Sequence, residues 1–170
     1  MSRKDRVNSF VRANNTGKLG EYLWSEHLKN LGWSIEQAPN KKFPDWDIKA
    51  SKGEQLYTYE VKLDIKAYYW ADRRGKPEEP NLYIEYHNTE RDRPSGIMMS
   101  KADYYVYCLK RNDDIKAYIY NRVQLLSFCQ TGNFKVVGCD IFGDGNAIGW
   151  IPPLHITMVP ESGFLKKVQL

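Results

Sequence analysis

The chain has 170 residues, of which 42% are hydrophobic and 27% are charged, and its formal net charge is +4. These values are typical of one globular domain with a real hydrophobic core, and they argue against a disordered chain. The small positive charge favours a polyanionic partner only slightly. No apolar run approaches the roughly 20 residues that a membrane-spanning helix needs, so we expect no membrane partner.

Cysteine usage and the N-terminus indicate the compartment. Cys108, Cys129 and Cys139 show no CxxC spacing, which favours a reducing setting and argues against a zinc site. The first residues, MSRKDR, lack the apolar segment of a signal peptide. We therefore expect an intracellular, cytoplasmic protein.

The first predicted element is a helix from Thr16 to about Leu31. Thr16 is a suitable N-cap residue, and Gly32 is typical of the position that follows a helix. Residues 1–15 are polar and basic, so we expect a flexible arm there, followed by a single domain at residues 16–170.

Glu21 lies at the border of the apolar face of this helix, beside Leu28 on a helical wheel. A carboxylate at the rim of a buried face needs a cation, a proton or another partner. Two interpretations stay open from the residues alone: Glu21 pairs with Lys18 or Ser25, or it belongs to a functional site.

A hairpin is predicted further along the chain. The side chains from Trp33 to Ala38 alternate with the period of two that predicts a first strand. Two more strand patterns lie between Phe43 and Asp64, on either side of the turn signal Lys52-Gly53. The hairpin loop has two, three or four residues, and the sequence leaves this choice open.

The second strand of this hairpin carries Glu60 and Lys62 on one face, because side chains two residues apart share a face. Folding back around residues 51–54 places Asp45 roughly opposite Glu60, with Asp47 one pair further in. With a loop of two or four residues, both aspartates fall on the face of Glu60 and Lys62. Several carboxylates and one ammonium group would then meet at one point.

The rest of the chain supplies the remaining elements. Residues 66–76 mix cations with aromatic residues, and we expect a loop there. Two interpretations stay open: the loop contacts phosphates and exposed bases, or it is a surface loop whose aromatic residues cover the edge of the core. Glu85 lies on the polar face of the strand predicted at Leu82–Tyr86. The other predicted elements are a strand at Leu82–Tyr86, a hairpin of Tyr104–Leu109 and Ile115–Tyr120, a helix from Asn121 to about Gln130, and short strands at Phe134–Val137 and His155–Val159.

Carboxylates beside a lysine are suited to phosphodiester chemistry. Mg²⁺ takes one or two carboxylates and keeps water and substrate phosphate as its other ligands. A metal held in this way activates a water and neutralises charge on the phosphate, and a nearby lysine orients the attacking water. The carboxylate–lysine cluster is the candidate site for chemistry, because the sequence has no P-loop, no G-x-S-x-G elbow and no dinucleotide-binding fingerprint.

The motif Pro44-Asp45 followed by Glu60-Val61-Lys62 resembles the active-site signature of the PD-(D/E)XK nuclease superfamily. In the Holliday-junction-resolvase-like branch, a helix with a glutamate precedes the hairpin, as residues 17–21 do here. That branch follows its aspartate with Ile-x-Ala, as in Asp47-Ile48-Lys49-Ala50. Residues 81–86 and 94–105 resemble blocks of small phage-type endonucleases, so the resemblance covers roughly residues 14–109.

The resemblance implies a single α/β domain of the restriction-endonuclease-like type, with a mixed central sheet flanked by helices. It implies hydrolysis of DNA phosphodiester bonds with Mg²⁺ or Mn²⁺ as cofactor, and it allows selectivity for junctions or branched DNA. Asp47 and Glu60 would bind the metal, Glu21 would complete the shell directly or through water, and Lys62 would position the nucleophile. The literal motif favours Asp45 as the ligand, whereas the spacing favours Asp47, which we prefer.

The expected partner is DNA, double-stranded or branched, and the resemblance allows a homodimer because many relatives cut two strands as dimers. The resemblance to phage-type endonucleases allows a protein that is encoded by a phage and acts in the cytoplasm of the host. The alternative function is a non-catalytic nucleic-acid-binding module on the same fold. The residues expected to contact DNA are Lys18, Lys41, Lys42, Lys66, Arg73, Arg74, Arg93 and Lys101.

Overall fold

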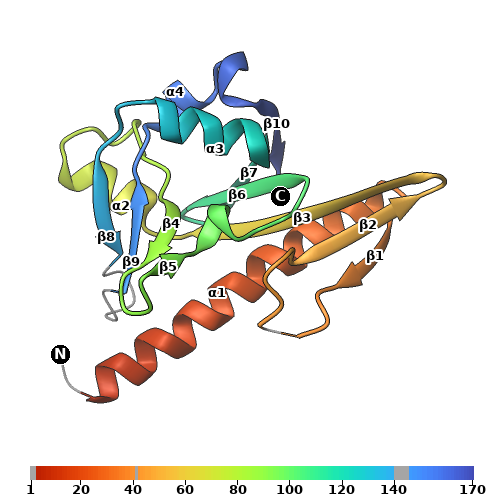
Figure 1. Ribbon diagram of the computed structural model, residues 1–170, viewed down its shortest axis with the longest axis horizontal. Coiled ribbons are helices and arrows are strands. Elements are labelled where there is room, and N and C mark those ends of the chain that lie inside the picture. Colours follow the sequence, from red (N-terminus) through yellow and green to blue (C-terminus); the bar gives the residue numbers. More distant parts are fainter. Residues whose placement is uncertain (1–2, 41, 140–145) are drawn as a thin grey trace.

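A six-stranded mixed sheet forms the centre of the molecule (Figure 1). β3 and β6 run parallel, and every other neighbouring pair in this sheet is antiparallel. The computed structural model describes residues 3–40, 42–139 and 146–170, without the side chains of residues 3–16 and 139. In spatial order the strands are β1 (Ser34–Gln37), β2 (Ile48–Lys52), β3 (Gln55–Asp64), β6 (Tyr104–Arg111), β7 (Asp114–Asn121) and β10 (Phe164–Gln169).

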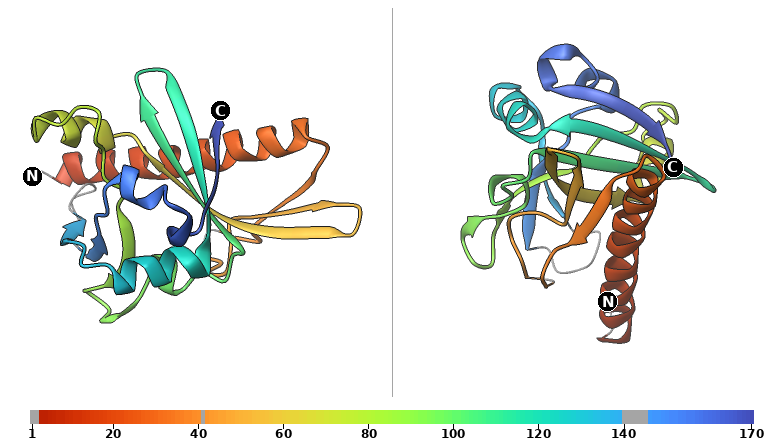
Figure 2. Two further views of the ribbon diagram at one scale, coloured as in Figure 1. Left: turned by 90° about the horizontal axis from the view of Figure 1, so that it is seen from above. Right: turned by 90° about the vertical axis from the view of Figure 1, so that its right-hand side faces the viewer.

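Helices cover both faces of this sheet (Figures 1 and 2). α1 (Arg3–Asn30) lies on one face, where Trp24 and Leu28 pack against β2, β3 and β6. α2 (Ala67–Arg73), α3 (Arg122–Thr131) and the short α4 (Leu154–Thr157) contribute to the core of the other face. The expected single α/β domain with a mixed central sheet flanked by helices is confirmed at this level.

A second, four-stranded sheet packs on the same side as α3. Its order is β5 (Arg93–Pro94), β4 (Ile84–Asn88), β9 (Ala147–Trp150) and β8 (Val136–Cys139). Ile84 is fully buried in the core of that side. Two 3₁₀ turns, η1 (Gly96–Met98) and η2 (Pro160–Ser162), complete the described elements.

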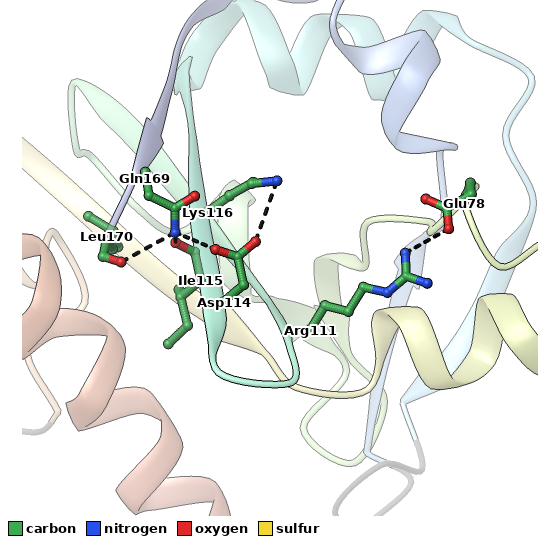
Figure 3. Close-up of polar contacts among 7 residues, drawn as sticks. All are labelled: Glu78, Arg111, Asp114, Ile115, Lys116, Gln169 and Leu170. Atoms are coloured by element: carbon green, nitrogen blue, oxygen red, sulfur yellow. Dashed lines mark hydrogen bonds and ion pairs between the residues drawn. The ribbon is translucent and has the colours of Figure 1, made fainter.

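Side-chain contacts fasten the far edge of the central sheet (Figure 3). The Gln169 amide donates to the Asp114 carboxylate and to the Ile115 carbonyl, which ties β10 to the start of β7. Arg111, at the end of β6, pairs with Glu78 at 2.9 Å (Nη1 to Oε1). The tip of the β6–β7 hairpin is thereby joined to the segment that follows α2.

Three expectations from the sequence need correction. The first helix begins at Arg3 and not at Thr16, so residues 3–15, for which we expected an arm ahead of the helix, belong to the helix. No glycine or proline interrupts residues 3–16, and once a helix has nucleated, each further residue extends it at little cost. The segment expected as a loop at residues 66–76 contains helix α2.

The third correction concerns the segment His155–Val159, for which the sequence predicts a strand. The chain forms the short helix α4 there, directly after Pro152-Pro153. Leu154 and Thr157, three residues apart, share its buried side.

Within the described ranges, no helix is both long enough and apolar enough to span a bilayer.

Candidate active site

The register of the β2–β3 hairpin positions Asp47. Ile48 pairs with Tyr59, so the next residue outward, Asp47, falls opposite Glu60. The Asp47 N–H donates to the Tyr59 carbonyl at 2.9 Å, which continues the ladder by one bond. Asp47 Oδ2 then accepts the N–H of Val61 at 2.8 Å, which fixes the carboxylate at the edge of β3.

Asp45 takes a different position. Its Oδ1 lies 3.4 Å from Nζ of Lys101, and its carbonyl accepts the Lys101 N–H at 2.8 Å. The expectation that Asp45 lies opposite Glu60 is therefore wrong. The two-residue loop at residues 53–54 gives that place to Asp47.

Glu60 and Lys62 form a close ion pair on β3, with 2.7 Å between Oε1 and Nζ. The Glu60 side chain is only 12% exposed, whereas the Lys62 side chain is 41% exposed. A buried carboxylate is costly unless a cation or several donors offset its lost hydration. Lys62 provides that charge and still reaches solvent.

The edge of β3 is open where Glu21 approaches. β2 pairs with β3 only as far as Tyr59, whereas β3 continues to Asp64. α1 packs closely against this stretch at Gly20, where an added Cβ would lie 3.0 Å from Cβ of Leu63. The absence of a side chain at Gly20 lets the helix approach, and this brings Glu21 near the hairpin.

The pKa values reflect this convergence. Partial burial, followed by the charge of Asp47, raises the pKa of Glu21 to about 7, against the opposing effect of Lys62. Burial also raises the pKa of Asp47, with Glu60 adding to the rise and Lys62 opposing it. Burial disfavours the Lys62 ammonium, but Glu60 and other nearby groups hold its pKa well above the ordinary value. The structure thus brings Glu21, Asp47, Glu60 and Lys62 into one electrostatic cluster.

Tyr105 extends this cluster, and sequence reasoning missed it. Tyr105 is opposite Glu60 in the parallel register of β3 and β6. Its side chain is fully buried, and burial raises its pKa, an effect to which Glu60 and Glu85 add and which Lys62 opposes. Glu85 therefore lies close enough to Tyr105 to act on it. Tyr105 is 45 residues away from Glu60 in the sequence, and only the pairing of β3 with β6 shows that the two are neighbours. The local sequence around Tyr105 predicts no more than an apolar strand.

The residues expected to contact DNA are dispersed over the surface. Lys18, Lys42, Lys66, Arg73, Arg74, Arg93 and Lys101 are all exposed, and Lys41 lies outside the described residues. Lys18 is near enough to Glu21 to lower its pKa. Arg74 donates through Nη2 to the Glu79 carbonyl at 2.9 Å, and Lys101 pairs with Asp45.

A hollow of about 290 Å³ lies at the other end of the hairpin strand. Of the described residues expected to contact DNA, Lys101 alone lies on its wall, and none of the clustered carboxylates lines it. Its lining residues are Leu56, Tyr57, Lys101, Ala102, Asp103, Tyr104, Asn121, Arg122 and Val123. The hollow is therefore separate from the cluster.

The donor set can be tested against a divalent ion. Among the described residues, no three acidic, histidine or cysteine side chains are grouped closely enough to hold a metal. Asp47 and Glu60 supply two hard oxygen ligands, which matches the one or two carboxylates that Mg²⁺ takes. The expected ligand group of Glu21, Asp47 and Glu60 is therefore not found among the described residues, and Asp47 and Glu60 remain as two oxygen donors of the kind that Mg²⁺ takes.

Comparisons with protein-family models, curated proteins and solved structures gave no significant match for this chain.

Proposed function

We propose that this protein is a metal-dependent DNA nuclease with a restriction-endonuclease-like fold. The observation that carries the proposal is the Glu60–Lys62 ion pair, with Asp47 in register opposite Glu60 and Glu21 of α1 near enough for these three groups to shift its pKa. Such a concentration of buried charge costs stability, and perturbed acidic groups of this kind gather at functional sites.

Each residue has a distinct task in this proposal. Asp47 and Glu60 would hold the ion, and a bound Mg²⁺ or Mn²⁺ would activate a water and neutralise charge on the scissile phosphate. Lys62 would orient the attacking water and stabilise charge that develops on the phosphate. The Val61 N–H holds the Asp47 carboxylate in place, so its orientation is fixed before any ligand arrives.

Glu21 would act from the side of the helix. With a pKa of about 7 it carries a proton for part of the time at neutral pH. A cation bound at Asp47 and Glu60 would favour the ionised form, which then accepts hydrogen bonds from metal-bound water. Glu21 thus supports the site without direct contact to the ion.

The test is a cleavage assay on supercoiled plasmid, single-stranded DNA and branched DNA, each with Mg²⁺, Mn²⁺ or chelator. We expect metal-dependent cleavage by the wild type and none by Glu60→Gln. Asp103→Asn serves as the matched control, because Asp103 is an acidic residue directly before β6 whose carboxylate accepts hydrogen bonds from Thr58. Retention of DNA in a gel shift without cleavage of any substrate would support the non-catalytic binding module instead.

A further inference from the structure

Helix α2 has an inverted distribution of side chains. Its small residues Ala67 and Ala71 are buried, whereas the large aromatic residues Tyr69 and Trp70 are 51% and 46% exposed. A surface helix ordinarily turns its large apolar groups toward the core. Packing of the core therefore does not explain why Tyr69 and Trp70 face solvent.

The neighbouring Tyr68 shows what a structural aromatic looks like on this helix. Tyr68 is partly buried against the core, and the Arg111 guanidinium lies 4.9 Å from the centre of its ring. Arg111 is itself fixed by Glu78, as Figure 3 shows. Tyr69 and Trp70 are not part of either core cluster of the described residues. Their ring centres are 5.1 Å apart at an interplanar angle of 72°, so their faces point in different directions at the surface.

Two cations of the same segment accompany this aromatic pair, and Asp72 is the acidic residue of the helix. Arg73, one turn further along α2, lies 6.0 Å from the centre of the Tyr69 ring, and Lys66 precedes the helix. Both cations are exposed. Exposed aromatic rings flanked by cations are the features with which proteins bind single-stranded nucleic acid, because the rings stack on bases and the cations meet phosphates.

We propose that this surface, formed by Lys66, Tyr69, Trp70 and Arg73, binds unpaired bases of a DNA strand that leads to the candidate active site. The inference rests on the proposed function, and it narrows the substrate to DNA with a single-stranded segment beside the cut. Bases in a duplex are stacked on one another, so their faces are accessible to protein rings only where the strand is unpaired.

The position of α2 supports this role. α2 follows β3 after only two residues, and Trp70 is eight residues beyond Lys62. Eight residues span at most about 28 Å when fully extended, and the helical part shortens this distance. A few nucleotides of single strand therefore bridge the aromatic surface and the carboxylate–lysine cluster.

Binding in the presence of chelator tests the surface independently of catalysis. The probes are a fluorescent single-stranded oligonucleotide, an abasic strand with the same number of phosphates, and a perfect duplex. We expect wild type to prefer the base-containing strand to the abasic one. Tyr69→Ala with Trp70→Ala should weaken binding of the base-containing strand by about ten- to a hundredfold, and change duplex binding by less than about twofold.

Controls separate stacking from other effects. Tyr22→Ala removes a 60% exposed tyrosine from α1 and should leave the preference unchanged, whereas Trp70→Phe should retain most of the binding because the ring remains. Equal affinity of wild type for the abasic and base-containing strands would overturn the proposal. So would a double variant that changes only the oligomeric state in light scattering, because the surface would then bind a second copy of the chain.

The experiments give different results when the proposed base-binding surface is wrong and when the proposed nuclease activity is wrong. If the double variant loses single-strand binding but no protein form cleaves DNA, the surface stands and the nuclease proposal fails. If wild type cleaves DNA and the double variant binds single strands normally, the surface is overturned and the nuclease proposal stands.

Discussion

The two faces of β3 bury side chains of different kinds. On one face Tyr59 and Val61 are almost fully buried under α1. On the other face Glu60 is nearly as buried, yet it is a carboxylate held against Lys62. Alternation along a strand places these opposite chemistries within one residue of each other. The apolar face holds the helix in place, and the polar face keeps charge in a position that is costly to maintain.

The comparison separates residues that stabilise the fold from residues that serve the site. Substitutions on the apolar face should lower stability and leave chemistry largely intact. Substitutions on the polar face should slow or abolish the chemistry. Those that remove Lys62 should also lower stability, because the buried Glu60 carboxylate then loses its cation. The following substitutions test this distinction.

The largest effect is expected at Lys62 and Glu60. Lys62→Met and Glu60→Gln should each lower the rate of DNA cleavage by about a hundred- to a thousandfold or more, because each removes charge needed in the transition state. The control Val61→Ala should cost about 1–3 kcal/mol in free energy of unfolding and retain cleavage. Single-turnover cleavage and urea unfolding measure the two effects. Wild-type cleavage by Lys62→Met would disprove its role.

The two aspartates give the next contrast. Asp47→Asn should abolish metal-dependent cleavage, since it removes a proposed ligand that is already held by the Val61 N–H. Asp45→Asn should lower the rate less than about threefold, because it loses only a partly exposed ion pair with Lys101. Cleavage rates at saturating Mn²⁺ measure the difference. A reversed order would mean that Asp45 is the functional aspartate.

Two glycines of α1 provide a smaller, geometric test. Gly20→Ala should push α1 away from Leu63 and displace Glu21, so we expect cleavage to fall by about tenfold. Gly17→Ala meets nothing within 4 Å and should leave cleavage unchanged, while a helical alanine adds about 0.5–1 kcal/mol of stability. If Gly20→Ala cleaves normally, the close approach of α1 has no part in the chemistry.

The smallest effect is a pH dependence. Glu21 is protonated below its pKa of about 7, and its charged neighbours are Lys18, Asp47, Glu60 and Lys62. Its raised pKa means that the folded form binds an extra proton between about pH 4.5 and 7, so Glu21 lowers stability as pH rises through that window. Metal affinity should rise over the same range, because the ion favours the carboxylate.

Glu21→Gln is the matched variant for this pH dependence. Mn²⁺ titrations between pH 6 and 8 should show a shallower rise in affinity for Glu21→Gln than for wild type. Urea unfolding of the variant should also lose less stability between pH 5 and 7. Identical pH profiles of the two proteins would show that Glu21 does not titrate near the site.

Local patterns in the sequence predicted most features of the β2–β3 hairpin. Alternation placed Glu60 and Lys62 on one face, and the Lys52-Gly53 signal located the turn to within a residue. The choice between Asp45 and Asp47 depended on loop length, which the residues alone left open. Tyr105 reaches the cluster through parallel pairing with β3, and a pairing between distant segments leaves no local pattern.

Other misses had equally specific causes. The helical character of α2 was hidden because its buried residues Ala67 and Ala71 are small while the large Tyr69 and Trp70 are exposed, so no stripe of large apolar residues marks its buried face. Gly20 stands out in the sequence only as part of a motif, although a glycine inside a helix signals a close contact. α1 extends to Arg3 because neither glycine nor proline interrupts residues 3–16, so Thr16, although a suitable cap, does not start it.

The most direct test of the central claim is calorimetric titration of Mn²⁺ into wild type, Asp47→Asn, Glu60→Gln and Asp45→Asn without DNA. We predict one saturable site in wild type and Asp45→Asn, weakened at least tenfold in the other two variants. Equal Mn²⁺ binding by all four proteins, or loss of binding only in Asp45→Asn, would contradict a metal site at Asp47 and Glu60.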